Sequence, residues 1–208
     1  MSRPTERDRD ATRARLLDAA AQVLSRKGYS DFGVNAVARE AGCDKVLIYR
    51  YFGGLEGLAQ ALGERLDVWL RLDLPLAPGG YGMVMGGLLG GYLQALRANG
   101  LVKRILAWEL VDTGPTVRAL GAAKSRAVSA WFQRARAQAA PPPADLDAPA
   151  INAILLAAAH HLALREDHDG TFAGLDLTQP DTWRRIETAM DLLIARAYPA
   201  AAEDRRHD

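Results

Sequence analysis

The sequence predicts an all-α protein with a small N-terminal group of short helices and a larger body of long helices. Alanine and leucine dominate a chain that is 49% hydrophobic and 25% charged, and β-branched residues are sparse. Apolar residues recur at helical spacing, and we find no convincing strand. Glycine and proline gather in a few short stretches that are typical of turns.

The helix starts and stops follow from these signals. Gly28 and Gly42 end helices, Asp44 is placed to cap the next one, and Gly53-Gly54 end that one in turn. The expected helices span residues 11–27, 34–41, 45–51, 55–72, 81–98, 101–112, 116–138, 150–167 and 180–197. The expected divisions of the chain are a disordered arm (1–10), a set of short helices (11–56), a body of longer helices (57–198) and a tail (199–208).

The stretch VNAVAREAGCDKVLIYRYF, residues 34–52, has the spacing of a helix-turn-helix. Two short helices flank a turn containing Gly42, with the small Ala38 where the helices cross and Ile48 as the buried aliphatic residue of the second helix. If Ile48 and Phe52 face the core, the helix presents another set of side chains outward. These are Lys45, Val46, Tyr49 and Arg50.

The outward residues have the chemistry that DNA recognition uses. Arginine bonds bidentately to guanine, lysine reaches guanine or phosphate, and valine meets a thymine methyl group. Tyrosine hydroxyls donate to phosphates, which we expect of Tyr49 and Tyr51. For Lys45, Tyr49 and Arg50 the alternative is a solvated helix face. The net charge of +1 does not itself favour a nucleic-acid partner.

The run from the first helix through AVAREAGCDKVLIYRYFGGLEGL resembles the N-terminal domain of the TetR family of transcriptional repressors over about residues 11–62. This resemblance implies a helix-turn-helix domain followed by a divergent, helical ligand-binding and dimerisation domain. It also implies a homodimer that pairs the helices at 150–167 and 180–197 and binds a palindromic double-stranded operator. The expected function is a repressor that a small molecule releases from DNA.

Three positions depart from the family pattern. Gly33 replaces a capping Ser or Thr, Cys43-Asp44 replaces Val-Ser, and Leu55 replaces a lysine that approaches phosphate. Asn35 is a substitute phosphate contact for the one lost at Gly33. The resemblance carries no effector identity. Candidate ligand-binding residues in the larger body are Leu89, Tyr92, Trp108, Glu109, Trp131 and His160.

Structural roles compete with ligand binding at several of these positions. For Trp108 we favour a core role over a pocket role, and for Glu109 a structural ion pair, for example with Arg104, over a ligand contact. The glycine pairs at 86–87 and 90–91 allow close helix packing, which we favour, or leave a cavity. A lone Cys43 is expected to be buried, and adjacent His160 and His161 diverge too far on a helix to chelate one metal together. We expect no metal and no cofactor.

Other function classes remain as alternatives. The same fold could serve an activator or a regulator that responds to a protein. A small helical enzyme using Glu109 and the histidines lacks a nucleophile–base set, so we expect no enzyme. The uncharged stretch 74–96 is long enough to span a bilayer, but Pro75, Pro78 and its glycines favour a loop and a soluble helix. The N-terminus has no secretory signal, so a cytoplasmic protein is expected.

Overall fold

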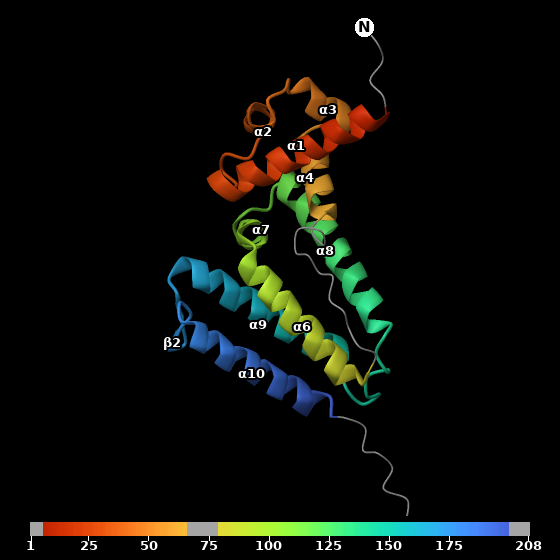
Figure 1. The fold of residues 1–208 in the computed structure, drawn as a ribbon, viewed down its shortest axis with the longest axis vertical. Coiled ribbons are helices and arrows are strands. Elements are labelled where there is room, and N and C mark those ends of the chain that lie inside the picture. Colours follow the sequence, from red (N-terminus) through yellow and green to blue (C-terminus); the bar gives the residue numbers. More distant parts are fainter. Residues whose placement is uncertain (1–5, 66–78, 200–208) are drawn as a thin grey trace, which may run out of the picture. The chain divides into compact units, whose positions relative to one another are not determined.

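The structure of the protein is a computed structural model that describes residues 6–65 and 79–199. It consists of helices and one small hairpin (Figure 1). The helices are α1 (Glu6–Lys27), α2 (Val34–Glu40), α3 (Val46–Phe52), α4 (Leu55–Glu64), α6 (Tyr81–Ala98), α7 (Gly100–Val111), α8 (Pro115–Arg136), α9 (Ala148–His168) and α10 (Pro180–Ala197). The strands are β1 (Thr171–Phe172) and β2 (Leu175–Asp176). The predicted all-α fold is confirmed.

The chain forms two compact units. Unit 1 takes the chain up to residue 70 together with residues 99–129, and unit 2 takes residues 71–98 and 130–208. The boundary predicted at residue 57, between the DNA-binding and the regulatory domain, falls inside unit 1. Helices α4 and α7 belong to this unit and pack with the short N-terminal helices.

Unit 1 is built around α1, which packs against α2, α4 and α7. Its core contains Leu16, Leu24, Ile48, Leu58 and Leu62, each fully buried. Since a fully buried aliphatic side chain contributes roughly 1.5–3 kcal/mol, this cluster fixes how the short helices sit on α1.

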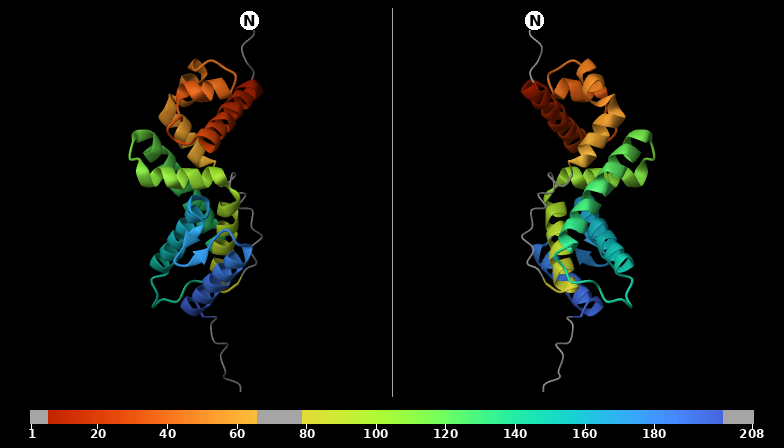
Figure 2. Two further views of the ribbon diagram at one scale, coloured as in Figure 1. Left: turned by 90° about the vertical axis from the view of Figure 1, so that its left-hand side faces the viewer. Right: turned by 90° about the vertical axis from the view of Figure 1, so that its right-hand side faces the viewer.

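Unit 2 is built around α6, which packs against both α9 and α10. Leu88, Leu93 and Leu96 are fully buried along α6. The side chain of Asp147 caps α9 by accepting a hydrogen bond from the Ala150 amide at 3.0 Å. The β1–β2 hairpin connects α9 to α10 and is drawn as blue arrows in both views of Figure 2.

Most predicted helices are confirmed within a few residues, and four kinds of expectation need correction. The first concerns helix ends. The helix predicted from residue 11 begins at Glu6, so residues 6–10 are helical and not a disordered arm. Acidic Glu6 and Asp8 in the first turn favour this start, because they interact well with the helix dipole. The helix predicted over 55–72 ends at Glu64. Its last predicted residues, most of the Pro/Gly loop and the tail from residue 200 lie outside the described residues.

The hairpin is the second correction, since no strand was predicted. Each strand has two residues, too few to show alternation, and the turn between them is Ala173-Gly174 with φ of 48° and 80°. Two successive left-handed residues are typical of a tight hairpin turn.

The third correction concerns α9, because the stretch 150–167 is apolar nearly all round and so predicts a heavily buried helix. Only Ala148, Leu155, Ala159 and Ala163 are buried in the single chain. The opposite side of the helix is apolar but exposed, with 69% of Ile154 accessible. Cys43 is the fourth correction, because it is half-buried and not fully enclosed.

Candidate nucleic-acid interface

The turn between α2 and α3 is closed by backbone and side-chain hydrogen bonds. Gly42 adopts a left-handed φ of 62°, and the Cys43 amide donates to the Ala38 carbonyl at 3.0 Å. Asp44 Oδ1 accepts a hydrogen bond from the Val46 amide at 2.8 Å, although the N-cap position of α3 is Lys45, one residue later than predicted. Because both ends of the turn are bonded, α3 has a fixed direction relative to α2.

The inward face of this unit is the predicted one. Val37 and Ile48 are fully buried and Ala38 is 6% exposed. Phe52 is only half-buried, because its ring lies at the surface beneath the guanidinium group of Arg13, 5.4 Å from the ring centroid. Gly53, with φ of 75°, ends α3 and donates its amide to the Tyr49 carbonyl at 2.9 Å.

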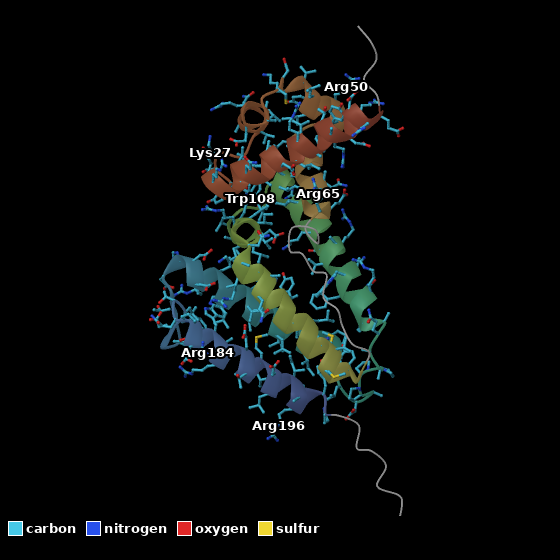
Figure 3. The ribbon with its side chains drawn as sticks, in the orientation of Figure 1. Lys27, Arg50, Arg65, Trp108, Arg184 and Arg196 are labelled. Atoms are coloured by element: carbon cyan, nitrogen blue, oxygen red, sulfur yellow. The ribbon has the colours of Figure 1, made fainter. Side chains whose placement is uncertain are left out.

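The outward face of α3 carries the predicted recognition residues. Val46 is 61% and Tyr49 54% exposed, and Lys45 and Arg50 are also exposed. Figure 3 shows Arg50 on the outer side of α3. Within residues 6–65 and 79–199, neither Lys45 nor Arg50 forms an ion pair. Both cations are therefore available to an external anion.

The remaining predicted contacts lie at the edges of this face. Asn35 is exposed near the start of α2, and Tyr51 is half-buried. Gly33 is the N-cap of α2 and offers no side-chain hydrogen bond, as its lack of a side chain requires. Leu55 is the first residue of α4 and is half-buried.

Comparisons with known proteins agree with this geometry. Residues 16–62 match the family model described as "Bacterial regulatory proteins, tetR family". The HTH-type transcriptional repressor SCO4008 of Streptomyces coelicolor is 30% identical over 108 residues, 52% of this chain and 54% of that protein. Residues 16–62 are therefore similar to the DNA-binding domain of TetR-type regulators. The match spans only about half of the Streptomyces repressor.

Solved structures extend the likeness in fold to the whole chain. The fatty acid degradation regulator FadR from Bacillus halodurans is 14% identical with a TM-score of 0.61, and the match covers 100% of both chains. FadR from Bacillus subtilis, solved in complex with stearoyl-CoA, is 14% identical with a TM-score of 0.56. That match covers 87% of this chain and 96% of FadR. The likeness in fold to these structures therefore extends beyond the DNA-binding helices.

Four of the six predicted ligand residues lie in unit 2. Tyr92 and Leu89 are buried on α6, and the Tyr92 hydroxyl hydrogen-bonds His160 Nε2 of α9 at 2.8 Å. Trp131 packs edge-to-face on Phe132, with ring centroids 4.8 Å apart, and Phe132 lies 6.1 Å from Tyr92. The structure thus gathers Tyr92, His160, Trp131 and Phe132 into one aromatic cluster. Phe132 is a member that sequence reasoning missed.

The other two predicted ligand residues belong to unit 1. Trp108 is buried between Tyr29 and Phe32 at 6.0 and 5.6 Å, and its indole N–H donates to Asp112 Oδ2 at 2.8 Å. These contacts make Trp108 part of the unit 1 core. Glu109 forms an ion pair with Lys124 of α8, so the pairing expected with Arg104 is wrong. Lys124 follows Glu109 by fifteen residues, a pairing that helix periodicity alone cannot reveal.

The sequence did not decide between close packing and a cavity at the glycine pairs of α6. The structure has a groove there, between α6 and α10. It has a volume of about 720 Å³ and continues into a smaller one of about 340 Å³. Gly86 lines both, and a Cβ built on it would have no atom nearer than 3.9 Å; at Gly90 nothing lies within 4 Å. Gly90 therefore leaves open space, so the close packing that we favoured is wrong there, whereas a Cβ at Gly86 would make ordinary contacts with Asp191 and Ile194.

The described residues contain neither a candidate metal site nor a candidate membrane-spanning helix. Within the described residues, no three His, Cys, Asp or Glu side chains are grouped so that they could hold a metal ion. Over the same residues, no helix has the length and apolar content needed to cross a membrane. Glu109 and His160 are each engaged within their own unit, by Lys124 and Tyr92.

Proposed function

We propose that the protein is a homodimeric repressor that binds a palindromic operator through α3 and is released by a small molecule. The observation that carries the proposal is the unpaired basic and apolar face of α3, held in direction by the bonded turn at Gly42–Asp44. A TetR-type domain over residues 16–62 supports the same conclusion. The DNA-binding domain then covers residues 11–56 and the regulatory domain residues 57–198, in a cytoplasmic protein.

Each residue of the α3 face has a role in this proposal. Arg50 reads a guanine, Lys45 reads guanine or phosphate, and Val46 contacts a thymine methyl group. Tyr49, Tyr51 and Asn35 donate to phosphates and set the register of the helix on the duplex. The ring of Tyr49 lies near Gly54, where a built Cβ would stand 3.8 Å from the ring, and the side chain is 54% exposed.

The exposed apolar faces of α9 and α10 support the homodimer. Ile154 on α9 is 69% exposed, and Leu192 and Leu193 on α10 are 57% and 58% exposed. Ala153 and Ala157 extend the exposed apolar side of α9. Large apolar side chains gathered on such faces are typical of a protein interface. A two-fold axis through these helices would present two copies of α3 to a palindromic site.

The effector site proposed for release is the aromatic cluster of Tyr92, Trp131, Phe132 and His160. It offers stacking surfaces and one polar pair, the Tyr92–His160 hydrogen bond, which suits an uncharged or weakly polar organic molecule. FadR of Bacillus subtilis, solved in complex with stearoyl-CoA, supports a small-molecule ligand for a protein of this fold. A ligand releases DNA only by its difference in affinity for the two states.

Selection of bound sequences from a random DNA pool tests the proposal. The full-length protein is used at one stated salt concentration, because affinity depends strongly on salt. We expect two inverted half-sites whose centres are separated by about one helical turn or a multiple of it. Enrichment of no sequence, or of a single half-site without symmetry, would contradict the dimeric repressor.

A further inference from the structure

The groove between α6 and α10 has the chemistry of a binding site for a ligand other than DNA. One wall is the N-terminal half of α6, the other is the C-terminal half of α10, and residues 140–143 close one side. Its floor is apolar, with Ile194 and Met83 among the lining side chains. At about 720 Å³ it falls in the range of small-molecule sites.

The charge of the groove is one-sided. Asp191 lines both the larger and the smaller part, and Glu187, one helical turn earlier on α10, lines the smaller part. Among residues 6–65 and 79–199, no lysine, arginine or histidine lines either part. Among the residues that the structure describes, neither carboxylate forms an ion pair or a side-chain hydrogen bond. Both are available to a cation.

Two tyrosines border the larger part, and their hydroxyls are already engaged. Tyr198 donates to Asn152 Oδ1 at 3.0 Å, and Asn152 Nδ2 donates to the Tyr81 hydroxyl at 2.9 Å. The rings pack edge-to-face with centroids 4.8 Å apart. Each tyrosine is only 4% exposed, so the pair forms a packed, largely apolar border of the groove and presents no positive charge to a ligand.

We propose that the α6–α10 groove binds a small organic cation with an apolar body. The cationic centre lies beside Asp191, where the two parts of the groove meet, and the apolar body fills the space that Gly86 leaves open. This site is separate from the aromatic cluster that we propose as the effector site. Because its test uses no DNA, a failure of this proposal can be distinguished from a failure of the repressor proposal.

The groove stays open in the dimer proposed above. Successive residues turn by about 100° on a helix, so Glu187, Asp191, Ile194 and Tyr198 share the face of α10 that lines the groove. Leu192 lies about 100° further round than Asp191, on the side that leads away from α6. Pairing through that side leaves the groove accessible.

The experiment compares two probes of the same shape and opposite charge, tetraphenylphosphonium and tetraphenylborate, by equilibrium dialysis against the full-length protein. We expect saturable binding of the phosphonium ion and at least about tenfold weaker binding of the borate. Asp191→Asn should weaken phosphonium binding about fivefold, as expected for one exposed ion pair. Asp181→Asn, the same charge change on α10 outside the groove, should leave it unchanged.

Gly86→Leu tests the position of the site without the risk of unfolding. Its Cβ meets only ordinary contacts at 3.9 Å, and leucine favours a helix more than glycine does, so the melting temperature should not fall. The leucine side chain fills the groove, and phosphonium binding should be lost. Equal binding of both probes, or full phosphonium binding by Gly86→Leu or Asp191→Asn, would overturn the proposal.

Discussion

The α-carbon of Gly57 lies directly against the backbone of Phe52, the last residue of α3. A Cβ built on Gly57 would stand 1.8 Å from the Phe52 carbonyl oxygen, far closer than two non-bonded atoms can approach. The first turn of α4 is therefore seated on the end of the recognition helix. Any side chain at residue 57 must push the two helices apart.

Gly57→Ala should destabilise the protein although alanine is the better helix former. We expect a loss of about 1–3 kcal/mol in the free energy of unfolding, the usual cost of forcing extra atoms into a packed contact. Operator affinity should fall too, because α3 loses its fixed position. Thermal unfolding and DNA binding measure the two effects.

Gly90→Ala is the matched control, since Gly90 is also helical but has nothing within 4 Å of a built Cβ. This change should raise stability by up to about 1 kcal/mol. If the two variants unfold at the same temperature, the contact between Gly57 and Phe52 is not as close as described.

Arg50→Ala should weaken operator binding by about 1–3 kcal/mol and relax the preference at one base position. The reason is that an unpaired arginine on the outer face of α3 can reach a guanine edge. Binding selections with both proteins at one salt concentration measure affinity and preference together. Arg26→Ala is the control. Arg26 lies in the last turn of α1 and not on α3, and it forms an ion pair with Glu40 of α2. An unaltered base preference in Arg50→Ala would remove Arg50 from the reading residues.

The parts of the fold that were predictable are those that local chemistry determines. The turn at Gly42–Asp44 and the stop at Gly53 follow from backbone conformations that glycine and aspartate favour, and the structure reproduces them. The β1–β2 hairpin was missed because two-residue strands have no periodicity; only Ala173-Gly174 signals a turn there.

Contacts between residues that are far apart in the sequence could not be predicted from it. The partner of Glu109 depends on how α7 meets α8, so Lys124 could not be preferred over Arg104. The role of Gly86 depends on the distance to α10, which helix spacing does not determine. Sequence reasoning expected close packing there, and the structure shows room for a Cβ at ordinary contact distance from α10.

Leu55→Lys should tighten operator binding and steepen its salt dependence. Leu55 is half-buried at the first residue of α4, where a lysine could reach the DNA backbone. One added phosphate contact changes the slope of log K against log salt by about 0.9. Titrations at several salt concentrations give the slope. Gln60→Lys adds the same charge further along α4 and should change the slope less; equal slopes would show that residue 55 does not face the backbone.

Asp112 links the stability of unit 1 to pH. Hydrogen bonds from the Trp108 indole and the Gly114 amide lower the pKa of its carboxyl group in the folded protein. The pKa of the unfolded chain, about 3.9, is therefore the higher one. The stabilisation is complete above that value and is lost as the pH falls through the folded pKa.

Asp112→Asn should accordingly lower the melting temperature at neutral pH, and the gap to the wild type should close below about pH 4. Thermal unfolding followed by tryptophan fluorescence measures the gap at each pH. Asp31→Asn is the control, since Asp31 is exposed in the same unit. A gap that stays constant down to pH 3 would show that the hydrogen bonds of Asp112 do not depend on its charge.

Leu192→Arg should convert the dimer into monomers. Leu192 is 57% exposed on α10, and a buried, unpaired arginine at the centre of an apolar interface costs several kcal/mol. Sedimentation velocity over a range of protein concentrations measures the change in mass. Affinity for a palindromic operator should fall with it, because one α3 then binds one half-site.

The control for this change is Leu110→Arg. Leu110 is 77% exposed on α7, in unit 1 and outside the proposed interface, so the substitution should leave the mass unchanged. The pair of variants separates a general effect of added charge from a local one. A Leu192→Arg protein that keeps the wild-type mass at low concentration would place the dimer contact elsewhere, and α10 would then need another explanation for its exposed leucines.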